Sequence, residues 1–302
     1  MIESLTVTNE KGDSLEMVLT HPELSGLLIS KIDGISPSDA TINTTDYGIL
    51  DGGVYNSARV GTRNITIEFY YLFQPDIETT RHIGYQYFPL KTRVELAFKT
   101  DHRTVVASGY IENNDTLIFS EQEKGQISVV CPDPYFYSEI NSSYEIVGVG
   151  REFEFPFENE SLYNPTICFG DYLTQSMATI PYEGDIVTGF VMTVRFLDDD
   201  VPNMRVIEDR TNTQIDFDLP GLKKAYGITP ERDDLIIISS IKGDRYITYR
   251  HLGNDTNLLA FYYRKIPWFE LFPGNNTYYV VATDNLQSVE VKFEFRTIYG
   301  GV

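Results

Sequence analysis

The chain has 302 residues, enough for one large β-domain or two ordinary domains that each bury a core. Aromatic residues make up 13% of it, and together with the many Val, Ile and Thr residues they favour strands. The formal net charge of −20 is spread over both halves, with 10 basic and 19 acidic side chains on residues 1–138. Such a surface repels nucleic acid phosphates and keeps a β-protein soluble, which argues against a DNA-binding protein.

The N-terminal stretch MIESLTVTNEKGDSLEMVLT is polar and alternating, with no basic start followed by an apolar run. No stretch approaches the roughly 18 apolar residues of a membrane span. We therefore expect a soluble protein without a signal peptide or membrane partner. Cys131 and Cys168 are too few for a disulfide framework, and both are expected to be reduced core residues.

The first strong period-2 pattern lies in RNITIEFYYLF, residues 63–73. Its odd positions form one apolar face and its even positions are polar, as expected for a half-buried strand. The apolar face consists of Ile65, Ile67, Phe69, Tyr71 and Phe73. A second strand of the same kind follows at 94–98, with Val94, Leu96 and Phe98 on one face.

Between these strands, residues 75–89 have a proline and an acid at their start and a proline at their end. Apolar residues fall at helical spacing, so the segment predicts a short helix. Gly84 weakens a helix unless a close packing contact requires a residue without a side chain.

The stretch VVCPDPYFYS, residues 129–138, ends a strand in an unusual way. Proline cannot donate to a β-ladder, so the strand must stop near Pro132, yet three aromatic residues follow at once. An exposed loop with three adjacent aromatics is uncommon on a monomer. We therefore expect a packed joint between two domains. Its residues are Cys131, Pro132, Asp133, Pro134, Tyr135 and Phe136.

After this joint a second all-β region begins, so the predicted domains are 1–138 and 139–302. Residues 235–241 and 277–283 are continuous apolar runs typical of more deeply buried strands, whereas EVKFEFR (290–296) alternates. The fold class is therefore mainly β, with two β-rich domains and one short helix in the first.

No constellation of residues predicts catalysis, a cofactor or a metal site. The four histidines (His21, His82, His102 and His251) lack metal-ligand spacing, and no nucleophile elbow or phosphate loop is present. Asp198, Asp199 and Asp200 are expected to form a solvated turn, since successive strand residues point to opposite faces. Trp268 is expected to be a core aromatic at the start of a strand, with a sugar-binding platform as the alternative.

Several separated stretches resemble the distal tail proteins of long-tailed, siphovirus-type bacteriophages and related prophage tail proteins. They are GVYNSARVGTRNITIEFYY (53–71), YFPLKTRVELAFKTDHRTVVASGYIE (87–112), GQISVVCPDPYFYS (125–138), WFELFPGNNTYYVVA (268–282) and the ending FEFRTIYGGV. They occur in the order found in that family and span both ends of the chain, while residues 140–265 match only loosely.

The resemblance implies a structural role in the virion tail tip and no enzymatic activity. The N-terminal domain would form a homo-hexameric ring that joins the tail tube protein to the tail-associated hub protein and the host-recognition apparatus. The C-terminal domain would be a galectin-like β-sandwich, with a receptor-binding protein as a further candidate partner. Synthesis and assembly would take place in the bacterial host cytoplasm.

Two expectations about the ring follow. An edge strand such as 63–73 would pair with a neighbouring subunit, and carboxylates lining the channel would let DNA pass without binding. The competing functions are a carbohydrate-binding adhesin, which would act as a monomer through exposed aromatics, and an enzyme on a β-sandwich, which would need a catalytic set.

Overall fold

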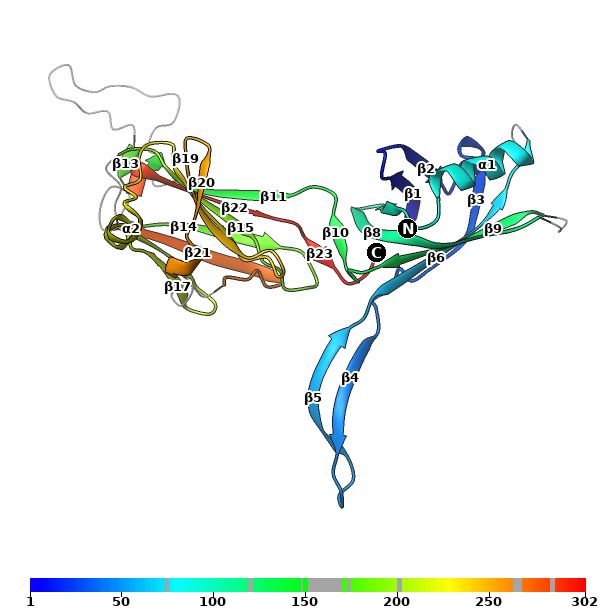
Figure 1. Ribbon diagram of the computed structural model, residues 1–302, viewed down its shortest axis with the longest axis horizontal. Helices are drawn as coiled ribbons and strands as arrows, with labels where there is room; N and C mark the ends of the chain where they lie inside the picture. Colours follow the sequence, from blue (N-terminus) through cyan, green and yellow to red (C-terminus); the bar gives the residue numbers. More distant parts are fainter. Residues whose placement is uncertain are drawn as a thin grey trace, which may run out of the picture. The chain divides into compact units, whose positions relative to one another are not determined.

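A computed structural model describes residues 1–73, 76–118, 122–147, 149–151, 170–172, 175–199, 203–262, 268–282 and 286–302. The chain divides into two compact units. Unit 1 contains residues 1–140 together with the last five residues, 298–302, and unit 2 contains residues 141–297. Both chain ends therefore lie in unit 1 (Figure 1).

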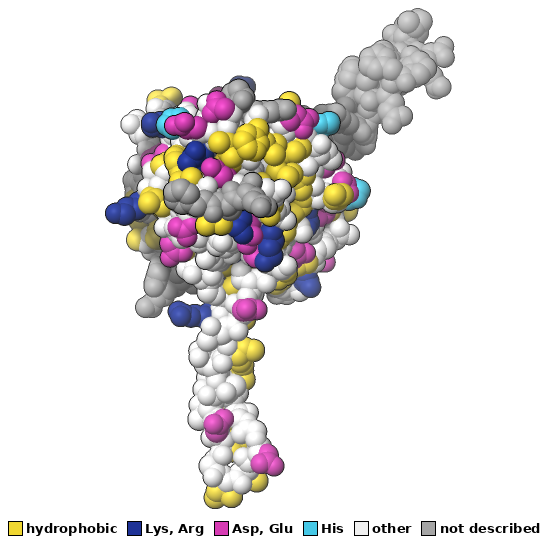
Figure 2. All heavy atoms as spheres, turned by 90° about the vertical axis from the view of Figure 1, so that its right-hand side faces the viewer, with side chains coloured by type: hydrophobic (Ala, Val, Ile, Leu, Met, Phe, Trp, Pro, Cys, Tyr) yellow, Lys and Arg dark blue, Asp and Glu magenta, His cyan; other side chains and the backbone are white. Residues whose placement is uncertain are grey.

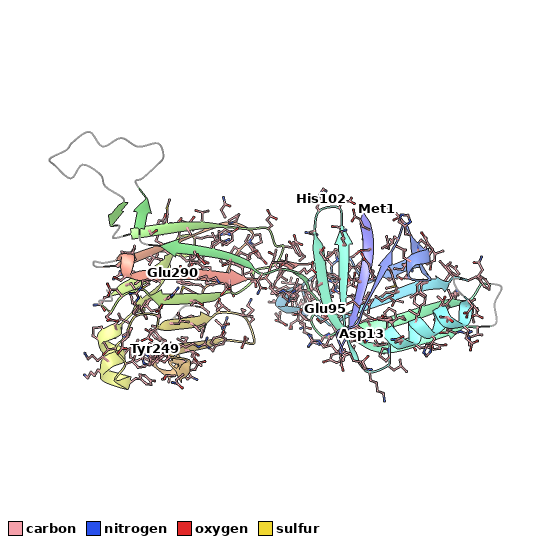
Figure 3. The ribbon with its side chains drawn as sticks, turned by 90° about the horizontal axis from the view of Figure 1, so that it is seen from above. Met1, Asp13, Glu95, His102, Tyr249 and Glu290 are labelled. Atoms are coloured by element: carbon pink, nitrogen blue, oxygen red, sulfur yellow. The ribbon has the colours of Figure 1, made fainter. Side chains whose placement is uncertain are left out.

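Unit 1 is built on a nine-stranded antiparallel sheet with the order β2-β1-β7-β8-β9-β6-β3, to which β10 and β23 are added beside β8. Its strands are β1 (Ile2–Asn9), β2 (Ser14–Val18), β3 (Leu27–Asp33), β6 (Arg63–Tyr71), β7 (Arg93–Thr100), β8 (Thr104–Leu117), β9 (Lys124–Cys131), β10 (Phe136–Ser138) and β23 (Ile298–Tyr299). In Figure 3, Met1 and His102 mark one end of the β1–β7 ladder, and Asp13 and Glu95 the other. A short 3-10 helix, η1 (Pro22–Leu24), precedes β3.

The predicted alternation is confirmed in β6 and β7, whose apolar faces lie in one buried cluster. The strand ends at Tyr71, however, and Phe73 is 75% exposed, so its prediction as a core residue was wrong. β6 is also paired on both sides, with β3 and with β9. It is therefore not an edge strand, and the expectation that 63–73 pairs with a neighbour was wrong.

The helix α1 (Ile77–Tyr87) confirms the helix expected within 75–89. Asp76 caps it, since its side chain accepts the Thr79 N–H at 2.8 Å, and Phe88 ends it because Pro89 disfavours a further helical turn. Gly84 is buried, and a Cβ there would lie 3.3 Å from the Tyr71 side chain. The absence of a Cβ at this position lets the helix approach the sheet closely.

A separate two-stranded sheet, β4 (Ala40–Asp46) with β5 (Gly53–Val60), projects from the body of unit 1 (Figure 1). We call this hairpin, residues 40–60, the arm. The sequence analysis did not predict it.

Unit 2 is a sandwich of a six-stranded and a four-stranded antiparallel sheet. The first has the order β11 (Ser142–Val147), β22 (Val289–Phe295), β15 (Val191–Phe196), β18 (Leu235–Ser239), β19 (Tyr246–His251) and β20 (Asn254–Asn257). The second has the order β14 (Gln175–Tyr182), β21 (Gly274–Ala282), β16 (Met204–Glu208) and β17 (Thr213–Phe217). Further elements are β12 (Val149–Arg151), β13 (Gly170–Tyr172), α2 (Leu219–Tyr226), α3 (Leu259–Tyr262) and η2 (Leu286–Ser288).

Residues of both sheets form one buried cluster, so the core of unit 2 lies between the layers. β22 alternates as predicted. In β21 the buried residues also alternate with half-buried ones, which differs from the deep burial expected for 277–283. The physical reason is that each sheet packs on one face only, so the residues between the buried ones face outward. None of the described helices is long and apolar enough to span a bilayer.

Candidate functional site

The arm is the part of unit 1 that buries least of its surface. Every residue of β4 is exposed, as is every residue of β5 except Val60. The two strands pair with each other and with no other described strand, which leaves the outer backbone edge of both unpaired. A two-stranded hairpin is marginally stable alone in water, so the arm is suited to gain order against another surface.

One face of the arm is apolar. Side chains alternate between the faces along each strand, and the register places Ile42 opposite Ala58 and Thr44 opposite Tyr55, on either side of a bulge. Ile42 is 62% exposed and Tyr55 is 63% exposed. The apolar face consists of Ala40, Ile42, Thr44, Tyr55, Ala58 and Val60.

The opposite face is polar over most of its length. Asn43 donates to the Ser57 hydroxyl at 3.0 Å, and Asn56 donates to the Thr45 hydroxyl at 2.7 Å. These cross-strand bonds hold the two strands in register without a core. The arm therefore has the amphipathic pattern of a half-buried strand pair, although unit 1 provides no cover for its apolar face.

The tip of the arm also exposes large apolar side chains, which Figure 2 shows at the end of the projection. Ile49 is 99% exposed, and Leu50 and Tyr47 are exposed beside it. Apolar groups at the end of a projecting hairpin have no role in the core of their own unit, and such exposed patches mark interaction sites.

The six predicted joint residues lie together at the end of β9 and the start of β10, all in unit 1. Cys131 ends β9 as a buried free thiol, and burial raises its pKa to about 11. Pro132 and Asp133 are exposed, while Pro134 and Tyr135 are half-buried. Asp133 accepts hydrogen bonds from the Tyr135 N–H and from the Tyr137 hydroxyl.

Phe136 is fully buried in the cluster that forms the core of unit 1, where it meets Phe98 edge to face at 5.8 Å. The sequence pattern predicts this ring between two domains. The structure shows instead that it completes the core of one unit, because β10 joins the sheet beside β8. That the segment acts as a joint stays a prediction.

Other sequence candidates have structural roles. Trp268 is partly buried against the core of unit 2, and the Arg245 guanidinium lies 5.1 Å from its ring centroid. Asp198 and Asp199 are exposed in a bend, and Asp199 accepts the Arg232 N–H at 2.9 Å. Cys168 and Asp200 lie outside the described residues. Among the residues that the structure describes, no group of three His, Cys, Asp or Glu side chains could hold a metal ion.

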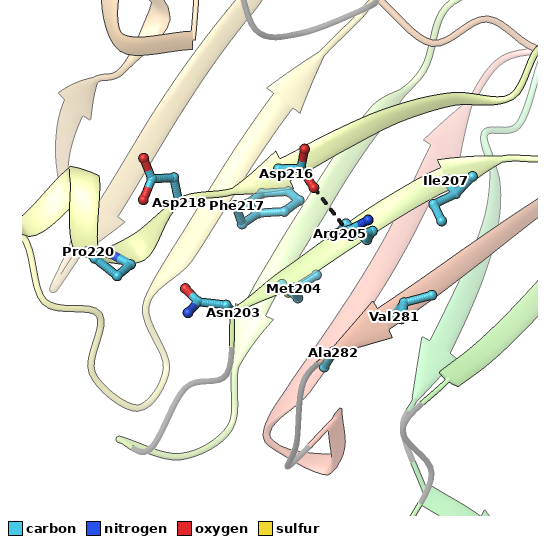
Figure 4. A pocket seen from close by; sticks show the side chains of 10 residues that line it. All are labelled: Asn203, Met204, Arg205, Ile207, Asp216, Phe217, Asp218, Pro220, Val281 and Ala282. Carbon is cyan, nitrogen blue, oxygen red and sulfur yellow. Dashed lines mark ion pairs between the residues drawn. The ribbon is translucent and has the colours of Figure 1, made fainter.

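A hollow of about 500 Å³ lies on the outer side of β16 and β17 (Figure 4). Arg205 pairs with Asp216 at 3.3 Å across it, and Asp218 accepts the Gly221 N–H at 2.9 Å as the N-cap of α2. Both carboxylates therefore stabilise the fold, and the hollow has no further feature that identifies a ligand.

The distal tail protein Dit (gp 19.1) of phage SPP1 aligns with 97% of this chain and 98% of its own, with a TM-score of 0.60 and 12% sequence identity. The chain has the fold of a phage distal tail protein.

The sequence of this Dit-like chain is far from that of the SPP1 protein. Two structures of the phage p2 baseplate align over 97% of the chain with 13% identity, but their TM-scores of 0.45 and 0.43 are too low for a conclusion. None of the protein-family models matches the chain, nor does any curated protein. The resemblance found in separated sequence stretches is thus confirmed by the fold, which aligns over both units.

Sequence reasoning missed the arm, although signals for it were present. Residues 40–46 and 53–60 contain three Thr, two Val, one Ile and one Tyr, and YGILDG between them is a turn signal. The alternation is weak because Thr and Ala occupy apolar positions, so the pattern did not separate a hairpin from a loop.

Proposed function

We propose that this protein is a structural component of a phage tail tip, whose copies assemble into a ring that joins the tail tube to the host-recognition apparatus. The proposal is supported by the Dit-like fold over the whole chain; the SPP1 protein is described as a paradigm of the hub of the adsorption apparatus in phages that infect Gram-positive bacteria. The role is structural rather than catalytic, and the protein would be found at the virion tail tip.

The observation that carries assembly is the arm with its uncovered apolar face. Fully burying a side chain such as Ile42 against a second copy contributes about 1.5–3 kcal/mol. The unpaired edges of β4 and β5 add backbone hydrogen-bond donors and acceptors. An arm on one surface and its acceptor on another make a head-to-tail contact, and such contacts form a ring when the rotation from one copy to the next closes.

We propose six copies per ring, with the tail tube protein, a hub protein and a receptor-binding protein as partners. Unit 2 would be the galectin-like outer module. Residues 1–138 carry 10 basic and 19 acidic side chains, and carboxylates facing the channel would let DNA pass without ion pairs. We therefore expect the purified ring not to retain DNA at physiological salt.

The test is the mass of the assembled protein. Native mass spectrometry and electron microscopy should show rings of six chains of 34.5 kDa each. Ile42→Asp, on the apolar face of the arm, should abolish the ring, whereas Thr41→Asp, one residue away on the polar face, should leave it intact. Loss of the ring in both variants would show that added charge, rather than the apolar face, disrupts the assembly.

A strictly monomeric wild-type protein at all concentrations, together with binding to a glycan, would favour the adhesin instead. The position of Trp268 argues against that alternative. Its ring is partly buried and its face is covered by Arg245, whereas a sugar platform needs an exposed aromatic face.

A further inference from the structure

Arg63 is a buried arginine that contacts three separate segments of unit 1. It is 3% exposed and is the first residue of β6, three residues after the arm ends at Val60. Its Nη1 donates to the carbonyls of Gly34 and Ser36, which precede the arm. The guanidinium therefore links the chain entering the arm to the chain leaving it.

The same guanidinium also reaches the two segments that connect unit 1 to residues 141–297. Nε donates to the Pro134 carbonyl at 2.6 Å, and Nη2 donates to the Gly300 carbonyl at 2.7 Å. Its carbon lies 4.4 Å from the centroid of the Phe136 ring. Among the described residues Arg63 makes no ion pair with a carboxylate, and burial lowers its pKa. Carbonyl dipoles and the face of an aromatic ring therefore compensate its charge.

The last five residues are held in place by further contacts. Tyr299 pairs with Phe136 in the β10–β23 ladder, and the Arg103 guanidinium lies 4.1 Å from the centroid of the Tyr299 ring. The Val302 N–H donates to the Ile35 carbonyl at 3.0 Å. A Cβ on Gly301 would lie 3.1 Å from that carbonyl oxygen, so the segment packs closely on residues 35–37. Residues 35–37 lie just before β4 in the chain.

We propose that Arg63 is a positioning residue. It couples the C-terminal segment, residues 298–302, to residues 34–37, which precede the arm. The arm is then held in one direction only when residues 298–302 are in place. Since the arm is the proposed assembly surface, ring formation would depend on residues 298–302. This consequence rests on the proposed function, whereas the coupling itself is a property of unit 1 alone.

The geometry requires an arginine. Its planar fork donates in several fixed directions at once, whereas a lysine ammonium on a flexible stem is a point charge that cannot reach all four carbonyls in the same way. We call the hydrogen bonds from Arg63 to these four carbonyls the clamp. Arg63→Lys therefore keeps the charge and removes the clamp. The matched control is Arg93→Lys, because Arg93 is also the first residue of a strand in the same sheet but is exposed.

The coupling is tested by the direction of the arm. Spin labels on cysteines introduced at Asp51 near the tip and Glu95 on β7, in a chain with Cys131→Ala and Cys168→Ala, report the arm-to-body distance after dilution with unlabelled chains. We expect one narrow distance distribution in the wild-type background and in Arg93→Lys. The distribution should broaden in Arg63→Lys, in Gly301→Ala and in a chain that ends at Thr297.

A second measurement uses hydrogen exchange at the Val302 amide. Arg63→Lys loses hydrogen bonds that the charged guanidinium makes, including the one to Gly300. The Val302 amide should therefore exchange about tenfold faster or more in this variant. If the chain ending at Thr297 does not fold, Arg63→Lys and Gly301→Ala still decide the question. Unchanged distance distributions in both point variants would overturn the proposal.

Native mass spectrometry measures separately whether each variant forms rings. Rings that persist in variants with a broadened distribution would refute the link between the clamp and assembly. A wild-type chain that never forms rings would refute the proposed function, while the distance distributions would still test the clamp.

Discussion

The half-buried His251 meets the buried Asp234 in unit 2, where the imidazole Nδ1 lies 2.7 Å from a carboxylate oxygen of Asp234. Asp234 is 2% exposed and also accepts the Glu231 N–H at 2.8 Å and the Tyr249 hydroxyl. Burial, together with the hydrogen bond from the Tyr249 hydroxyl to Asp234, raises the pKa of Tyr249. One carboxylate thus joins the chain before β18 to two side chains of β19, the strand on which Figure 3 labels Tyr249.

We expect Asp234→Ala to destabilise unit 2 by about 2–4 kcal/mol, because three donors lose their acceptor inside the protein. Denaturant unfolding of the full chain, followed by near-UV circular dichroism, measures the change. Asp255→Ala is the control in the same hairpin, because its pair with Arg250 is exposed to solvent and should contribute little to stability. Equal effects of the two substitutions would contradict the importance of burial.

Gly84 should not tolerate a branched side chain. Gly84→Val places atoms against Tyr71, and overpacking of this kind costs about 1–3 kcal/mol. Gly61→Val is the matched control, because a Cβ at Gly61 has nothing within 4 Å. Thermal unfolding should show a lower midpoint for the first variant and little change for the second. A similar midpoint in both would mean that α1 moves away from the sheet at little cost.

Alkaline pH should destabilise unit 1 through Cys131. Burial raises the pKa of this thiol from 9.0 to about 11, so the folded state favours the protonated form. The resulting stability is fully present below pH 9 and is lost as the pH rises towards 11, by about 2–3 kcal/mol in all. Unfolding measured between pH 8 and 11 should therefore show a shallower loss of stability in Cys131→Ala than in the wild type. Parallel pH profiles would show that the thiol does not contribute.

Residues 139–296 should be removable without unfolding unit 1. Tyr137 and Ile298 are paired in the β10–β23 ladder, so Ser138 and Thr297 emerge side by side. A chain in which a two-residue Asn-Gly turn joins Ser138 to Thr297 should fold cooperatively, because such turns close antiparallel strands. A chain of residues 1–138 alone should be less stable, since it lacks the ladder partner of Phe136. If the joined chain is unfolded, unit 1 depends on unit 2.

The sequence by itself determined the mainly β class, the face of β6 from Ile65 to Tyr71, the helix within 75–89 and the end of β9 at Pro132. These features depend on local chemistry: side-chain alternation, the Asp76 cap and the missing N–H of proline act within a few residues. Ordered motifs along the chain also carried the resemblance to distal tail proteins, which the fold confirms.

Only the tertiary structure decided where Phe136 packs, that β6 lies inside the sheet and that residues 298–302 return to unit 1. Each depends on pairing between segments far apart in the chain, such as Arg63 and Gly300, which are separated by 237 positions. Alternation shows that a strand has a buried face, but it does not show which strands lie beside it. The arm is a local hairpin and was hidden for a different reason: Thr and Ala at its apolar positions weaken the alternation, and the pattern does not show whether an apolar face is covered.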